Sequence, residues 1–113
     1  MFGFRNADQS GADIPPDADL RCLLAVLHDQ LQATDSEHGD VAVTDYDSGW
    51  TVSAHRDGRA VFENLRGEPG ARHMHPVSRE RMLELWERFV VAGPRWVVKL
   101  GGLATFDRLS SCA

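Results

Sequence analysis

The chain has 113 residues, the length of one domain, and 42% of them are apolar, too many for a disordered protein. No apolar run approaches the length of a membrane span, so a membrane protein is not expected. Residues 1–50 contain ten acidic side chains against Arg5 and Arg21, while the remainder contains seven acidic and ten basic side chains. Nucleic acid is not expected as a partner either, because phosphate binding needs a concentrated basic surface.

Residues 1–16 are rich in Gly, Asp, Asn and Pro and end in two prolines, which disfavour helix. We expect an N-terminal arm that is partly disordered, with Phe2, Phe4 and Ile14 able to hold it to the body. The first residues lack a basic segment followed by an apolar one, so no signal peptide is expected and a cytoplasmic location follows. In that compartment, Cys22 and Cys112 are not expected to form a disulfide.

The first helix is expected from about residue 17 to residue 32. Asp17 and Asp19 stand where a helix N-terminus favours negative charge and a capping oxygen. The apolar residues that follow recur at helical spacing and form one stripe: Leu20, Leu23, Leu24, Leu27 and Leu31.

Residues 40–65 alternate in the manner of a three-stranded antiparallel meander. For the strands at 50–55 and 59–64, a two-residue turn would place Glu63 on the apolar face. A three-residue loop at 56–58, with Gly58 in the left-handed conformation, instead pairs Val52 with Phe62 and Ala54 with Ala60. We predict this second register, because a slip of one residue would invert every side chain.

The preceding loop, around residues 47–49, allows two registers as well. An even-length loop places Val41 and Val43 on the face that holds Trp50, with Asp45 at its rim. An odd-length loop would place Ala42, Thr44 and Tyr46 there, so we prefer the even one. A fourth strand is expected at residues 71–76, ending at a proline.

The second helix is expected after Ser78, which can cap it, and before Gly93-Pro94, which stops it. Its buried stripe is Met82, Leu85, Trp86, Phe89 and Val90. A last strand at 95–100 and a tail at 103–113 complete the chain. The prediction is an α+β domain over residues 17–102, in the order α-β-β-β-β-α-β, in which two helices pack on one face of an antiparallel sheet of four or five strands.

One candidate binding site is an acidic rim before and within the meander. Five carboxylates occur there without an intervening Lys or Arg, beside two aromatic residues of the types that anchor protein interfaces. These residues are Asp35, Glu37, Asp40, Asp45, Asp47, Tyr46 and Trp50. They would suit a basic protein partner, although acidic loops are also commonly just solvated.

The histidines are a second candidate. His73 and His75 project from one side of the fourth strand, and His55 is expected on the same outer face of the sheet. Imidazoles so placed could bind a transition metal. Strand spacing separates His55 from the other two, so exposed polar side chains without a metal are the preferred interpretation.

Catalytic signatures are absent from the sequence. None of its serines or cysteines lies in a nucleophile elbow, and its glycine pairs lack the spacing of a phosphate-binding loop. We therefore expect a binding protein without a cofactor, not an enzyme.

Residues 38–93 resemble small bacterial proteins of the toxin-immunity type. The resemblance lies in the Gly49-Trp50 hairpin, the Phe-Glu-Asn-Leu strand at 62–65, Arg72-His73-Met74, and the helix opening Val-Ser-Arg-Glu at 77–80 with its Leu85-Trp86 pair. It implies an acidic single domain that neutralises a cognate toxin by binding it, as a monomer or a homodimer.

A second resemblance is to type III secretion chaperones, which are also small, acidic, helix-flanked antiparallel sheets. It implies a protein that wraps an extended effector segment. The order of elements fits this class only in part, because a strand and a tail follow the second helix here. A small metal-dependent enzyme using the histidines is the remaining alternative.

Overall fold

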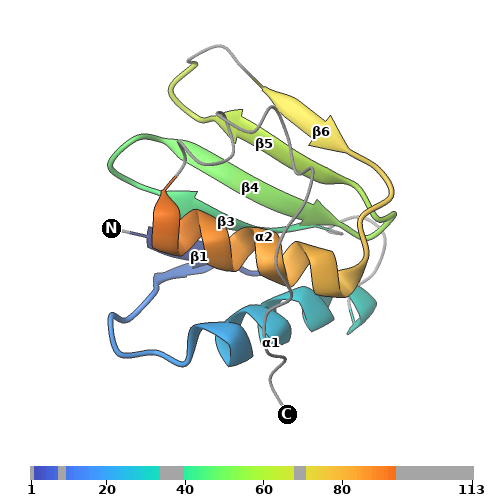
Figure 1. Ribbon diagram of the computed structural model, residues 1–113, viewed down its shortest axis with the longest axis horizontal. Coiled ribbons are helices and arrows are strands. Elements are labelled where there is room, and N and C mark those ends of the chain that lie inside the picture. Colours follow the sequence, from blue (N-terminus) through green and yellow to red (C-terminus); the bar gives the residue numbers. More distant parts are fainter. Residues whose placement is uncertain (1, 8–9, 34–39, 68–70, 94–113) are drawn as a thin grey trace.

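The computed structural model describes residues 2–7, 10–33, 40–67 and 71–93. These residues form an antiparallel sheet of six strands with two helices side by side on one of its faces (Figure 1). The expected α+β class with two helices on one face is therefore confirmed. The predicted strand at 95–100 and the tail at 103–113 lie outside the described residues.

The strands of the sheet lie in the order β2-β1-β3-β4-β5-β6. Their bounds are β1 Phe2–Arg5, β2 Gly11–Asp13, β3 Asp40–Asp45, β4 Trp50–His55, β5 Ala60–Asn64 and β6 Arg72–Met74. Helix α1, Leu20–Ala33, connects β2 to β3, and helix α2, Arg79–Ala92, follows β6. The element order is thus β-β-α-β-β-β-β-α.

The first sixteen residues correct the sequence-based prediction, because they contribute two strands where an arm was expected. β1 lies between β2 and β3 and pairs with both, and its Phe2 and Phe4 alternate toward the core. Ile14 also packs against the core, as expected. These strands have four and three residues and contain glycine, so their alternation is too short and weak to predict them from the sequence.

The predicted registers of the meander are confirmed. Val52 lies opposite Phe62 and Ala54 opposite Ala60, and Gly58 has a φ of 92° in the three-residue loop. On the other side of β4, Val43 lies opposite Val52, as the even-length loop requires. One face of the sheet is consequently apolar across its central strands.

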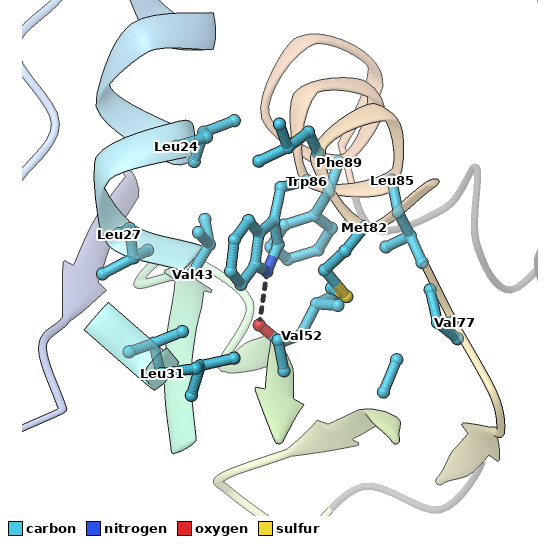
Figure 2. Packing of buried hydrophobic residues seen from close by; sticks show 14 of the residues in the cluster. Leu24, Leu27, Leu31, Val43, Val52, Val77, Met82, Leu85, Trp86 and Phe89 are labelled. Atoms are coloured by element: carbon cyan, nitrogen blue, oxygen red, sulfur yellow. Dashed lines mark hydrogen bonds between the residues drawn. The ribbon is translucent and has the colours of Figure 1, made fainter. Parts of the chain in front are cut away.

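The two helices cover this apolar face and close the core. Leu24, Leu27 and Leu31 of α1 meet Trp86 and Phe89 of α2 above the sheet (Figure 2). The indole Nε1 of Trp86 donates a hydrogen bond of 2.9 Å to the carbonyl oxygen of Val52 on β4 (Figure 2). This bond fixes α2 over the middle of the sheet, because a buried indole N–H needs an acceptor.

The helix ends follow the sequence signals. The Asp19 side chain accepts a hydrogen bond from the backbone N–H of Cys22 at the start of α1. The Ser78 side chain accepts one from the backbone N–H of Arg81, and Gly93 ends α2 with a φ of 84°. Cys22 itself differs from expectation, since it is disulfide-bonded. The other cysteine of the sequence, Cys112, lies outside the described residues.

Candidate functional site

The face of the sheet that the helices leave uncovered, called the outer face here, has small side chains at its centre. Ala42, Thr51 and Ser53 are each at most 5% exposed. The hydroxyl of Thr51 lies 2.8 Å from that of Thr44 across the strand pair and donates to the carbonyl of Val43. Because these polar groups already have partners, the centre of the outer face offers little to a ligand. Larger side chains and two open pockets lie toward its ends.

The β3–β4 turn at one end of this face is closed by several hydrogen bonds. The carboxylate of Asp45 accepts hydrogen bonds from the backbone N–H of Asp47 and the hydroxyl of Ser48, at 3.1 and 2.8 Å. Its carbonyl oxygen accepts from the N–H of Gly49, whose φ of 84° closes the turn. Asp45 is only 6% exposed, so its charge serves the turn and not a partner.

Arg66, which follows β5, connects the β3–β4 turn to the end of β5 by hydrogen bonds. Its guanidinium donates to the carbonyl oxygens of Tyr46 at 2.7 Å and Asp47 at 2.9 Å. The Asn64 amide adds a third bond of 3.0 Å, to the carbonyl of Ser48. These bonds connect the backbone of the β3–β4 turn, including Tyr46, to the end of β5 and the residues after it.

The Tyr46 ring lies over Gly3 of β1, where a Cβ atom would come within 2.6 Å of ring atoms Cε2 and Cζ. It remains 44% exposed, and Leu65 nearby is 63% exposed. Both side chains line an open pocket of about 340 Å³, the Tyr46 pocket. Its other lining residues are Phe4, Arg5, Gly11, Thr44, Gly49 and Arg66.

The residues of the predicted acidic rim do not share one surface. The Asp40 carboxylate is ion-paired with Arg5, and the Asp45 carboxylate belongs to the turn. Trp50 faces the core, where its ring stacks on that of Phe62 with centroids 4.5 Å apart. Tyr46 and Asp47 remain at the surface of the turn. Asp35 and Glu37 lie outside the described residues.

Sequence reasoning missed Leu65 and Arg66. Position 65 continues the outward alternation of Val61 and Glu63, so an apolar residue there was a detectable sign of an exposed hydrophobic side chain. No sequence signal indicated the role of Arg66, because it bonds to backbone atoms of the turn about twenty residues earlier.

The three candidate metal-binding histidines are engaged separately. His55 Nε2 lies 3.2 Å from the hydroxyl of Ser53, and burial together with the charge of Arg59 lowers the His55 pKa. His73 lies opposite Val61, and His75 Nε2 is 3.0 Å from the carbonyl oxygen of Asp57. Within the described ranges, no three His, Cys, Asp or Glu side chains are grouped so that they could hold a metal ion.

Comparison with known proteins finds no family model, no curated protein and no solved structure that matches this chain. None of the helices in the described part is long and apolar enough to cross a membrane.

Proposed function

We propose that this protein is a non-catalytic binding module for another protein, and that the Tyr46 pocket is its contact surface. The observation that carries the proposal is the exposure of Tyr46 and Leu65 around an open pocket on a turn held by Arg66. Aromatic residues anchor protein interfaces, and a rigid backbone lowers the entropy that binding costs. Neutralisation of a toxin, as in the immunity proteins that the sequence resembles, is the specific role we propose.

The partner's charge is less constrained than the sequence suggested. The Asp40 carboxylate is ion-paired with Arg5 and the Asp45 carboxylate is enclosed in the turn, while the pocket lining contains the cation of Arg66. A basic partner remains our proposal on the net charge of −5 of the whole chain. Its contribution would be to the rate of association more than to affinity.

Affinity capture from the native host tests the proposal, with three baits in parallel. The parent protein is compared with a Tyr46→Ala/Leu65→Ala variant and with a Val26→Ala/Val91→Ala variant. Val26 and Val91 are matched controls, because they are 66% and 75% exposed and lie on the helices. We expect one partner to bind the parent and the control but to be lost from the Tyr46/Leu65 variant.

A partner retained by the Tyr46/Leu65 variant would contradict the choice of surface. The specific role has its own test, because an immunity protein should relieve growth arrest caused by its captured partner when the two are co-expressed. A partner that does not arrest growth would exclude the immunity role while leaving protein binding intact. An Asp40/Asp45/Asp47→Ala variant is a poor probe here, since it would break an ion pair and a turn.

The sequence predicts a cytoplasmic location, and we keep this as a proposal to be tested. The disulfide bond at Cys22 is an argument against it. Disulfides persist in oxidising compartments and are rare in the cytosol. Thiol titration of protein purified from its host without reductant distinguishes the two cases. Free thiols would support the cytoplasm, and their absence would indicate an oxidising compartment.

A further inference from the structure

A second pocket, the β6 pocket, opens at the other end of the outer face and has a volume of about 480 Å³. It lies between β5, β6 and the β4–β5 turn. Four of its seven lining residues have basic side chains: the lining comprises Asp57, Arg59, Val61, Ala71, Arg72, His73 and His75. Its volume falls within the range of about 300–1,000 Å³ that is typical of small-molecule sites.

The walls of this pocket are held in place by hydrogen bonds. The segment after β6 is fastened to the β4–β5 turn twice, by His75 Nε2 at 3.0 Å from the Asp57 carbonyl and by the Val77 N–H donating to the Gly58 carbonyl at 2.7 Å. Val61 pairs with His73 across the β5–β6 ladder and supplies an apolar surface. The pocket is therefore formed by the fold itself, before any ligand arrives.

The net charge of the lining is positive, because it contains two arginines against one carboxylate. In the part of the chain that the structure describes, the guanidinium groups of Arg59 and Arg72 make no hydrogen bond and no ion pair. The one carboxylate of the lining, Asp57, accepts a hydrogen bond of 3.0 Å from the Arg59 backbone N–H. That bond, followed by the charges of Arg59 and the nearby histidines, lowers the Asp57 pKa. Within the described ranges, the two guanidinium groups thus have no hydrogen-bond acceptor, and the one carboxylate of the lining already accepts a bond.

We propose that the β6 pocket binds a small oxyanion with at least two negative charges, through phosphate or carboxylate groups. Arginine suits this chemistry, because its planar fork binds both kinds of oxyanion with two parallel hydrogen bonds. His73 and His75 provide further nitrogen atoms at the rim, and Val61 contacts the carbon skeleton of an organic anion. The site is independent of the Tyr46 pocket and of the protein-binding role proposed for it.

NMR titration of the full chain with inorganic pyrophosphate and, separately, with succinate tests this proposal. Sodium chloride at matched ionic strength is the blank. We expect saturable shifts at millimolar concentration for one or both anions in Arg59, Arg72, His73 and His75, with the tighter anion identifying phosphate or carboxylate as the preferred group. The His55 pKa should rise on binding, because the bound charge opposes the lowering effect of Arg59.

The variants Arg59→Gln and Arg72→Gln should each weaken binding about tenfold or more, since a hydrogen bond to a charged group contributes about 1.5–3 kcal/mol. Arg81→Gln on α2 is the matched control for loss of one positive charge and should leave binding unchanged. Amide spectra of the free variants check that each is folded. Absence of saturable shifts with both anions, or equal weakening in all three variants, would overturn the proposal.

Discussion

The two faces of the sheet differ in where their large side chains lie and in how exposed these side chains are. On the inner face, large side chains such as Trp50 and Phe62 pack under two helices and are almost fully enclosed. On the outer face, small residues occupy the centre, and large ones such as Tyr46 and Leu65 stand exposed at the end. Large side chains are therefore buried in the core on one face and exposed to solvent at the end of the other.

The largest effect expected from this difference is at Trp86. Trp86→Ala should destabilise the protein by about 3–5 kcal/mol, because it empties a fully buried site and removes the hydrogen bond to Val52. Trp86→Phe keeps most of the ring and should cost about 1–2 kcal/mol for the lost bond. Urea denaturation measures both.

Leu65→Ala on the outer face is the counterpart of these changes. It should alter stability by no more than about 0.5 kcal/mol, since Leu65 is 63% exposed. If Leu65→Ala were as costly as Trp86→Ala, the outer face would be part of the structural core, and the contrast between the faces would fail.

An intermediate effect is expected at Gly3, beneath the Tyr46 ring. Gly3→Ala should cost about 1 kcal/mol, because the new methyl group must displace the ring from its place over β1. In a Tyr46→Ala background, the same change should be neutral or slightly stabilising, since alanine is favoured over glycine within a strand. A double-mutant cycle of unfolding free energies measures this coupling, and equal costs in the two backgrounds would show that the ring lies elsewhere.

The smallest expected effect is a dependence of stability on pH. It comes from two histidines, one on each side of the sheet. His28 lies between the helices, with its ring centroid 6.0 Å from that of Trp86, and its pKa is lowered from 6.5 by burial and then by Arg79. His55 on the outer face is lowered from 6.5 by burial and then by Arg59. The unfolded chain therefore binds protons first as the pH falls.

Stability should accordingly be complete above about pH 6.5 and should decrease as the pH falls from there toward the folded-state pKa values. The lowered pKa values of Asp29 and Asp57 act at lower pH, around their ordinary value of 3.8. Urea midpoints between about pH 7.5 and about pH 5.5 measure the histidine effect. His28→Gln and His55→Gln should each flatten part of the slope, and an unchanged slope in both would contradict this assignment.

The sequence predicted most of the inner face, because alternation and turn length together fix a register. Val52 and Phe62 could be placed opposite each other for this reason, and the caps at Ser78 and Gly93 were readable from local chemistry. The disulfide at Cys22 was not predicted, because the expectation of no disulfide followed only from the expected cytoplasmic location.

The outer face was harder to predict because its contacts join distant segments. Five carboxylates close in sequence suggested a binding rim, yet Asp40 finds its partner in Arg5, 35 positions earlier, only because β1 pairs with β3. The position of the Tyr46 ring likewise depends on Gly3 in β1, because a side chain there would occupy the same space. Composition can show where charges are abundant, but only the strand order shows which of them are neutralised.

The position of β1 also protects the protein from aggregation. β3 contains the apolar run Val41-Ala42-Val43, and β1 occupies its free edge. Without the first hairpin, these residues would form an open edge with unpaired backbone groups, the template on which strands of other molecules add. Deleting residues 1–13 to obtain a shorter domain should therefore yield an aggregation-prone protein. In the full chain the edge strand is β2, which is short and ends in Asp13, and such an edge resists the addition of further strands.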